Sequence, residues 1–143
     1  LQDFVHNGML NRKGMFNQAV DLIQKFQIKA KPRDRVRTLS GGNLQKVLLA
    51  RVLSRNPKVI IVPQPTRGLD VGASDYIRSQ LLEQRERGAA VLLVSEDLEE
   101  IMALSDRIAV IYEGQIMGIV PAAEATPQKL GLLMGGHSGE EVN

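Results

Sequence analysis

Apolar residues recur along this chain at two different periods, which predict helices and strands in alternation. Apolar residues three and four positions apart predict helices at about residues 41–55, 72–87 and 127–134, and a shorter helix after Ser95. Unbroken apolar runs at 59–62 and 90–94 predict strands buried on both faces of a parallel sheet. This alternation implies an α/β fold, a mostly parallel sheet flanked by helices.

The two ends of the chain follow other patterns. Residues 1–38 are polar and basic, and their one apolar stripe has helical spacing, at Phe16, Ala19, Val20, Ile23 and Phe26. Pro32 keeps the charged connector 29–35 from being helical. Near the other end, Glu113–Gly114 joins 107–112 to 115–120 as a two-residue β-hairpin. We expect the polar tail, residues 136–143, to be disordered.

Capping residues mark where the predicted helices begin and end. Ser40, Asp70, Ser95 and Thr126 each stand where a side-chain oxygen is expected to cap a helix. Gly88 and the pair Gly135–Gly136 are expected to end helices, because glycine adopts the left-handed conformation without strain. Glu83 and Arg87 stand four residues apart and are expected to form an ion pair on the helix surface.

Composition narrows the class of protein. The chain has 143 residues, about one domain, of which 43% are apolar and only 3% aromatic, so the core is expected to be aliphatic. A net charge of +2 without interleaved aromatic residues argues against a nucleic-acid partner. The absence of cysteine excludes a disulfide framework, and no run approaches the ~20 apolar residues of a membrane span. Because the chain starts at Leu1 rather than at a methionine, and its sequence pattern is already under way there, we expect it to be a fragment of a longer polypeptide.

The residues Leu39–Lys46 carry the most specific chemistry. Ser40, Gly41 and Gly42 stand at the mouth of a strongly apolar helix, where backbone N–H groups lack intrahelical acceptors and the helix dipole is positive. The glycines allow a close approach to the backbone, and the serine adds a hydroxyl. Such a mouth suits a phosphate group. Taken alone, the same three residues are more typical of a cap and turn before a core helix.

A second motif follows at Pro63–Asp70, directly after the first predicted strand. Leu39–Lys46 and Gln64–Ala73 in this order resemble the signature motif and the Walker B and D-loop region of an ABC ATPase. More narrowly, they resemble the tandem ATPase subunits of bacterial simple-sugar and nucleoside importers, which carry two cassettes in one polypeptide. The chain is similar to the C-terminal part of the second cassette.

The resemblance implies a division of the chain and a fold. Residues 1–38 would be the end of the helical subdomain, residues 39–135 the C-terminal half of the ATPase core, and residues 136–143 the tail. The fold would be a partial ABC ATPase domain with a C-terminal β-hairpin. The phosphate-cradling P-loop and the Q-loop would lie upstream of Leu1, so no ATP or Mg²⁺ is expected on this segment alone, although both serve the full-length protein.

The resemblance also implies roles for particular residues. Two cassettes of the family face each other head to tail, and the signature of one contacts ATP held by the other. Ser40, Gly41, Gly42 and Asn43 would bind that nucleotide in trans. Asp70 would couple the two cassettes, a role compatible with helix capping. Arg67 is as compatible with a partner contact as with simple solvent exposure.

Three positions depart from the family pattern. The family places an aspartate and then a glutamate after the strand, and a histidine after the next strand. Pro63, Gln64 and Glu96 occupy these positions here. Proline offers no metal ligand, glutamine cannot accept a proton as a carboxylate does, and a glutamate beside a γ-phosphate is repulsive. We therefore predict no catalytic residue on this chain. His6 and His137 stand in poor contexts for catalysis and are treated as incidental.

Three hypotheses remain open at this point. The segment is a non-hydrolysing half of an import ATPase, or a competent ATPase that uses Gln64, or an interaction module that docks on a permease through the helical face at 16–27. The partners implied are a second cassette, membrane permease subunits and, for the isolated segment, further copies of itself. The implied location is the cytoplasmic face of the cell membrane. Sugar and nucleoside importers share these motifs, with a slight leaning toward nucleosides from Pro63–Gln64.

Overall fold

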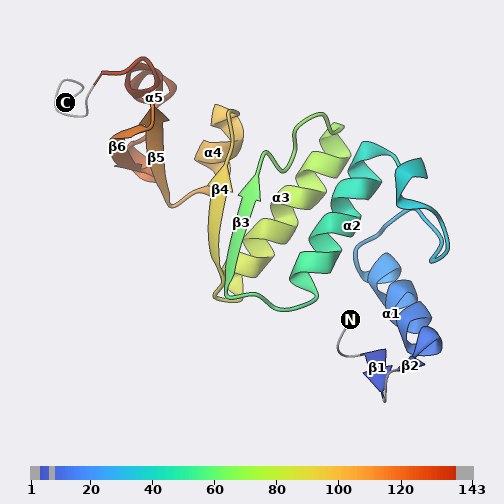
Figure 1. The fold of residues 1–143 in the computed structure, drawn as a ribbon. Coiled ribbons are helices and arrows are strands. Elements are labelled where there is room, and N and C mark those ends of the chain that lie inside the picture. The colour runs from blue at the N-terminus through green and yellow to red at the C-terminus, as the bar shows by residue number, and fades with distance from the viewer. Residues whose placement is uncertain (1–3, 7–8, 138–143) are drawn as a thin grey trace. The chain divides into compact units, whose positions relative to one another are not determined.

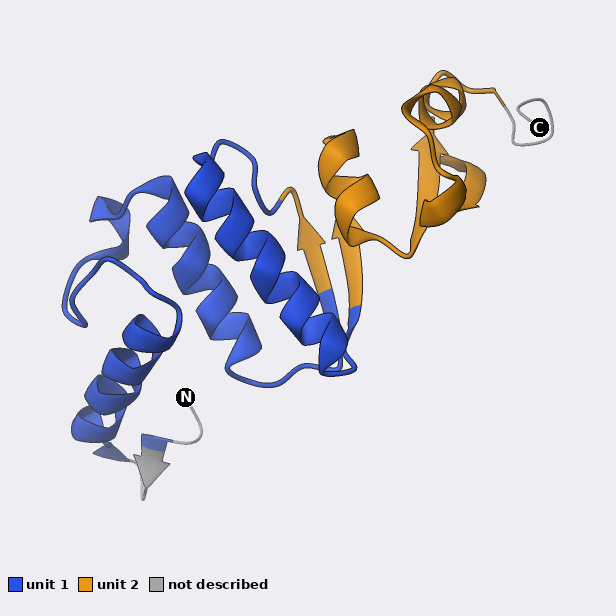
Figure 2. Cartoon of the chain, turned by 180° about the vertical axis from the view of Figure 1, so that it is seen from behind, with its two compact units in different colours: residues 1–60, 65–90 blue, residues 61–64, 91–143 orange. Residues whose placement is uncertain are grey.

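The structure is a computed structural model that describes residues 4–6 and 9–137 (Figure 1). The chain forms two compact units, which Figure 2 shows in different colours. Unit 1 comprises residues 1–60 and 65–90, and unit 2 comprises residues 61–64 and 91–143. The expected tail lies mostly outside the described residues, and the expected boundary at residue 38 stays a prediction.

Helices make up most of unit 1. They are α1 (Arg12–Lys25), α2 (Gly41–Leu53) and α3 (Val71–Glu86), and α2 and α3 lie side by side (Figure 1). A short antiparallel pair, β1 (Val5–His6) and β2 (Met9–Leu10), precedes α1 and was not predicted. A single 3₁₀ turn, Val36–Thr38, leads the chain into α2. The predicted helices at 41–55 and 72–87 are thus confirmed to within two residues at each end.

The apolar faces of these helices form the core of unit 1. On α3, Ala73, Ile77 and Leu81 are buried, as their spacing predicted. At the end of the stripe predicted for α1, Phe26 is buried and 1% exposed. Phe16, at the other end of the stripe, is 43% exposed, and the Arg33 guanidinium lies 5.8 Å from its ring centre.

Strands β3 (Val59–Pro63) and β4 (Ala90–Val94) form a two-stranded sheet. The N–H of Ala90 donates to Lys58 where both strands begin, and the N–H of Gln64 donates to Val94 where both end, so the strands are parallel. The prediction that both faces are buried was wrong. Ile60 is buried, but Ile61 is 68% exposed and Leu92 57% exposed, because nothing in the described part of the chain covers that face.

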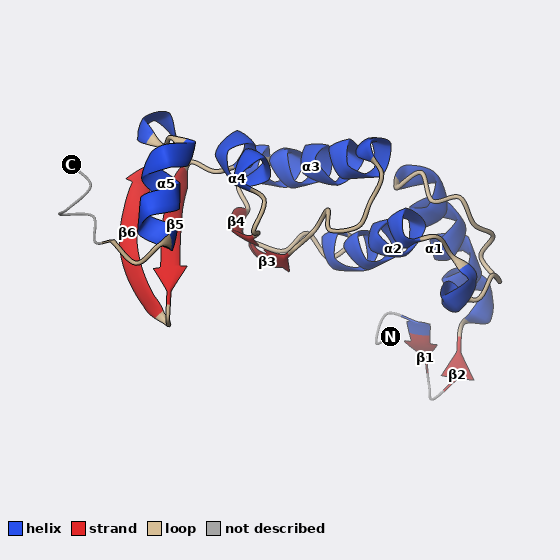
Figure 3. Cartoon of the chain, turned by 90° about the horizontal axis from the view of Figure 1, so that it is seen from above, coloured by secondary structure: helices blue, strands red, loops and turns tan. Residues whose placement is uncertain are grey.

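Unit 2 contains the predicted hairpin and the last helix. The antiparallel strands β5 (Arg107–Tyr112) and β6 (Gln115–Pro121) are joined by a turn in which Glu113 and Gly114 have φ of 47° and 79°, as a type I′ turn requires. Helix α5 (Pro127–Met134) packs against the hairpin (Figure 3). The core of unit 2 consists of Ile108, Val110, Val120, Ala125, Leu130 and Leu133.

The short helix α4 (Leu98–Leu104) begins later than predicted. Asp97, rather than Ser95, is its N-cap, and its Oδ1 accepts the N–H of Glu100 at 3.1 Å. The Ser95 hydroxyl instead accepts the N–H of Asp97 and forms a turn before the helix. Thr126 is the N-cap of α5, and Gly135 is its C-cap, followed by Gly136 with a left-handed φ of 87°, so the helix begins and ends as predicted. None of the described helices is both long enough and apolar enough to cross a lipid bilayer.

Candidate functional site

The mouth of α2 presents backbone donors without acceptors. The chain is extended at Leu39 and Ser40 and turns helical at Gly41, so the first bond of the helix runs from the N–H of Leu44 to the carbonyl of Ser40. The N–H groups of Gly41, Gly42 and Asn43 find no acceptor among the residues that the structure describes. Three amide donors and the positive end of a 13-residue helix therefore meet at one point.

The Ser40 side chain does not cap the helix, contrary to the sequence prediction. Ser40 occupies the N-cap position, but its hydroxyl makes no capping bond. Instead, Asn43 Nδ2 donates to Ser40 Oγ at 2.9 Å, and Asn43 Oδ1 accepts the N–H of Lys29 at 2.7 Å. The Asn43 amide therefore joins the mouth of α2 to the connector that follows α1. Lys29 lies 14 positions away, so no local pattern could have revealed this contact.

Both glycines of the motif lie against the start of α3. A Cβ on Gly42 would come 3.0 Å from the Cβ of Ala73, closer than side chains ordinarily pack, and 4.0 Å from Asp70 Oδ2. A Cβ on Gly41 would meet only Leu69, at an ordinary 3.7 Å. Position 42 therefore requires glycine because the two helices approach closely, whereas position 41 has room.

Two further side chains tie α2 to the segment after β3. Gln45 Nε2 donates to the carbonyl of Pro65 at 3.0 Å, and Pro65 is itself fully buried. The Lys46 ammonium lies 4.2 Å from the centre of the Tyr76 ring on α3 and donates to the carbonyl of Gln27. Gln45 and Lys46 belong to the motif that the sequence shows, but no local pattern indicates these partners.

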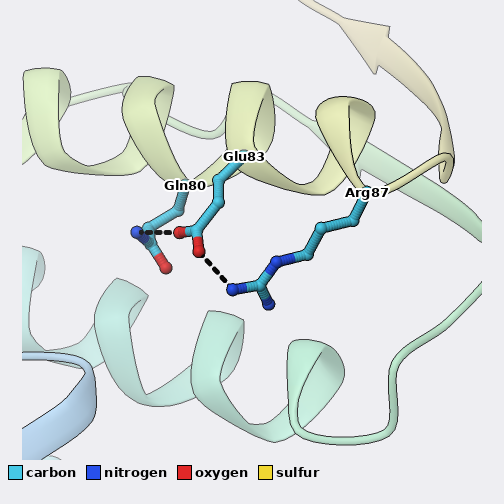
Figure 4. A network of polar contacts seen from close by, with 3 residues as sticks. All are labelled: Gln80, Glu83 and Arg87. Atoms are coloured by element: carbon cyan, nitrogen blue, oxygen red, sulfur yellow. Dashed lines mark hydrogen bonds and ion pairs between the residues drawn. The ribbon is translucent and has the colours of Figure 1, made fainter.

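The Tyr76 phenol lies within the same junction of α2 and α3. Burial, and then the nearby Glu83 carboxylate, raises the pKa of Tyr76. Glu83 accepts hydrogen bonds from Gln80 and from Arg87, one on each side along α3 (Figure 4). The predicted pair of Glu83 and Arg87 is thus confirmed. Its charges stabilise the surface of α3 and do not reach the mouth of α2.

Asp70 caps α3, which confirms the structural part of its predicted role. Its Oδ1 accepts the N–H of Ala73 at 2.9 Å, and the residue is exposed. Arg67 is exposed as well. Coupling of Asp70 to another cassette stays a prediction. The mouth of α2 and the cap of α3 nevertheless lie together in unit 1, as the Gly42 contacts require.

The three altered positions lie at the carboxyl ends of β3 and β4, in unit 2. Pro63 is the last residue of β3, and Gln64 follows with a left-handed φ of 47° and its N–H bonded to Val94 at 2.7 Å. Glu96 is exposed, just beyond the end of β4. The carboxyl edge of a parallel sheet is where an α/β fold places ligands. The three altered positions carry a proline, an amide and an exposed carboxylate, a poor set for acid–base or metal chemistry.

The two histidines are distant in sequence from these motifs. His137 is exposed, and its Nδ1 lies 3.2 Å from the carbonyl of Leu132. His6 is in β1, and its side chain lies outside the described part of the chain. Among the described residues, no three His, Asp or Glu side chains gather where they would hold a metal ion.

A groove of about 360 Å³ lies elsewhere in unit 1. Its apolar lining comes from α1 and α2 and includes Ala19, Leu22, Ile23, Val47 and Ala50. Its charged lining includes Lys31, Arg51, Arg55 and one acid, Asp34. The helical face at 16–27 therefore does contribute to a concave apolar surface with a mainly basic rim.

Comparison with known proteins gives a consistent result. The family described as "ABC transporter" matches residues 2–67. The guanosine import ATP-binding protein NupO of Bacillus subtilis is 49% identical over 136 residues, covering 94% of this chain and 27% of that protein. The ribose import ATP-binding protein RbsA of Lactococcus lactis is 42% identical, covering 90% of this chain and 26% of that protein. The chain thus spans about a quarter of the length of these relatives.

Solved structures agree on the fold. The ATP-binding cassette MJ0796, in a dimeric post-hydrolysis state with ADP and Pi, superposes with a TM-score of 0.67 at 24% identity, covering 82% of this chain and 51% of that one. A putative metal-chelate type ABC transporter in an inward-facing conformation gives a TM-score of 0.75 at 15% identity, covering 94% of this chain and 54% of that one. At these identities the likeness establishes the fold alone. The expected fold class, a partial α/β ATPase domain with a parallel sheet and an antiparallel hairpin, is confirmed.

Proposed function

The chain belongs to the ABC transporter ATPase family, and from that premise we propose that it presents residues 40–43 to an ATP molecule held by a partner cassette. In this proposal its own hydrolytic site is inert. The mouth of α2 stabilises the terminal phosphate of that ATP and so helps to close two cassettes around it. This segment then contributes to hydrolysis without performing the proton transfer itself.

One observation carries the proposal, namely the three unused amide donors at the mouth of α2. Every helix leaves its first N–H groups without acceptors inside the helix, and because no side chain caps them here they stay available to an external acceptor. A terminal phosphate has three charged oxygens, and it approaches the backbone closely at Gly41 and Gly42 because no Cβ stands there. The Ser40 hydroxyl, which is exposed, adds a fourth donor.

The second half of the proposal, an inert local site, is supported by the chemistry of three side chains. Pro63 offers no oxygen to a metal-bound water, Gln64 can orient a water but cannot take its proton, and Glu96 repels a γ-phosphate. A Mg²⁺ ion, which the family implies, therefore finds no fitting ligands among these three side chains. The proposed function therefore needs no metal ion bound at these positions.

Replacing Ser40 with alanine in the full-length protein, assembled with its permease, tests the donation. We expect ATP turnover to fall about tenfold, because one hydrogen bond to a charged phosphate is lost while the amide donors stay. Steady-state ATPase assays measure the change. Ser79→Ala is the matched control, since Ser79 is exposed on α3, outside the groove described above, and its hydroxyl donates to the carbonyl of Tyr76 in the same helix. Unchanged turnover in Ser40→Ala would contradict the proposal.

Replacing Gln64 with glutamate in the same assembly tests whether the local site is inert. We expect no rise in ATP turnover, because a restored base still lacks the metal-holding acid at Pro63 and faces Glu96. Gln128→Glu, on the exposed surface of α5, is the control for an added charge. A large rise on the Gln64 change alone would instead support the alternative of a competent site that uses Gln64.

The groove between α1 and α2 favours a second candidate function, docking of the permease. Its apolar floor and mainly basic rim suit a helix that carries acidic residues beside an apolar face. Docking and phosphate binding involve different parts of unit 1, so they are compatible. If docking were the whole function, substitutions at Ser40 would leave ATP turnover untouched.

The substrate and setting follow from the relatives. Proteins named as guanosine and nucleoside importers are 49% and 47% identical to this chain, and a ribose importer is 42% identical. We therefore propose a nucleoside first and a simple sugar second. The partner cassette is proposed to lie in the same polypeptide, with the permease holding both at the cytoplasmic face of the membrane. Transport assays with radiolabelled guanosine and ribose distinguish the two substrates.

A further inference from the structure

We propose that Asn43 is a positioning residue, whose side-chain amide sets the Ser40 hydroxyl as a hydrogen-bond donor and keeps it from capping α2. The inference rests on the function proposed above. It assigns the Asn43 side chain a role beyond the nucleotide binding expected for this residue, namely directing a neighbour that binds the phosphate. The amide N–H of Asn43 remains one of the three free backbone donors.

The orientation of the Asn43 amide follows from its partners. The group that faces it at 2.7 Å is the backbone N–H of Lys29, which can only donate. The atom of Asn43 on that side must therefore be the carbonyl oxygen. The NH₂ group is then on the side of Ser40, where Nδ2 lies 2.9 Å from Oγ. The Lys29 contact thus determines which end of the amide meets the hydroxyl.

This orientation fixes what the Ser40 hydroxyl can do. A hydroxyl has one proton and two lone pairs, and one lone pair accepts the proton of Asn43 Nδ2. Its own proton has no acceptor in the described part of the chain, and the residue is exposed. The hydroxyl is therefore available to donate to an external anion.

The same bond also preserves the backbone donors. A serine at the N-cap normally accepts an N–H from the second or third residue of the helix, here Gly42 or Asn43. Ser40 has the extended backbone of an N-cap, with φ of −64° and ψ of 158°, yet makes no such bond. Because the hydroxyl is held by the Asn43 side chain, both amide protons stay free. The helix loses a cap, and the mouth keeps its full set of donors.

Asparagine and aspartate differ in whether the side chain can donate a hydrogen bond. An aspartate at position 43 has nearly the same shape and can still accept the Lys29 N–H through one oxygen. Its other oxygen can only accept a hydrogen bond. The Ser40 hydroxyl would therefore donate to that oxygen and no longer to the phosphate. Asn43→Asp therefore keeps the structural tie to Lys29 and reverses the bond to Ser40.

The test measures kcat and KM for ATP in the full-length, permease-bound protein for Asn43→Asp, Ser40→Ala and the double variant. We expect Asn43→Asp to lower kcat at least tenfold, as Ser40→Ala does. In the Ser40→Ala background, Asn43→Asp should add little, because the hydroxyl through which it acts is gone. Asn17→Asp, on the exposed surface of α1, controls for an added charge, and thermal melting verifies that each variant is folded.

The outcomes separate this inference from the proposed function. If Ser40→Ala leaves turnover unchanged, the proposed phosphate donation fails and the inference fails with it. If Ser40→Ala lowers turnover but Asn43→Asp does not, only the inference is overturned. If Asn43→Asp lowers kcat equally with and without the Ser40 hydroxyl, it acts by charge or by structure, and the positioning role is again overturned. Non-additive losses in a folded protein support it.

Discussion

Gly42→Ala in the full-length protein is expected to lower ATP turnover about tenfold, because a shift of ~1 Å at a reacting site costs about 100-fold and this substitution shifts the donors by less. The new methyl group would lie 3.0 Å from the Cβ of Ala73, so the start of α2 has to move away from α3. That movement displaces the free amides of residues 41–43 together. ATPase assays with the permease-bound protein measure the loss.

Gly131→Ala is the matched control for this effect. Gly131 lies within α5, and a Cβ there would meet nothing within 4 Å. The same change should leave turnover intact and raise stability by about 0.5–1 kcal/mol, because alanine restricts the unfolded chain. If Gly42→Ala and Gly131→Ala gave equal turnover, the close approach of α2 and α3 would have no bearing on the reaction.

Much of the fold could be predicted because its signals are local. The inward face of α3 follows from the spacing of Ala73, Ile77 and Leu81, and burial confirms all three. The hairpin turn at Glu113–Gly114 is indicated by its glycine, which adopts a positive φ without strain, between two apolar runs. The cap at Thr126 is equally local, since its side chain bonds an amide three residues away.

What could not be predicted depends on contacts between distant residues or on what covers a surface. The apolar runs of β3 and β4 indicate strands but cannot show whether both faces are packed, and Ile61 and Leu92 prove to be exposed. At the site, a serine at position 40 indicates a helix cap. Its hydroxyl instead accepts a hydrogen bond from the Asn43 side chain, which the N–H of Lys29 holds in place. The bond from Gln45 to Pro65 joins residues 20 positions apart and is likewise invisible to local patterns.

The donors and the altered catalytic positions occupy different units of the chain. Residues 40–43 belong to unit 1, where Gly42, Gln45 and Lys46 tie α2 to Pro65 and α3. Gln64 and Glu96 belong to unit 2 and follow β3 and β4. The contacts that hold the donors involve none of the three altered side chains, which is compatible with the proposal that this cassette has an inert site of its own and serves the site of a partner.

Unit 2 depends on a small core, and Leu130→Ala is expected to destabilise it by about 2–5 kcal/mol. Leu130 is fully buried among Ile108, Val110, Val120 and Leu133, so the truncation leaves a cavity that α5 and the hairpin cannot fill. A loss of this size is a large fraction of the ~5–15 kcal/mol that holds a typical domain together. Urea denaturation followed by circular dichroism should show a clearly lower midpoint.

Leu132→Ala on the same helix provides the comparison that identifies the cause. Leu132 is 46% exposed, whereas Leu130 is 0% exposed, so the two substitutions remove the same atoms from opposite environments. Helix propensity changes equally in both, because each replaces leucine with alanine within α5. We expect Leu132→Ala to cost less than about 1 kcal/mol. Equal losses would mean that α5 does not pack on the hairpin through Leu130, and the core assigned to unit 2 would be wrong.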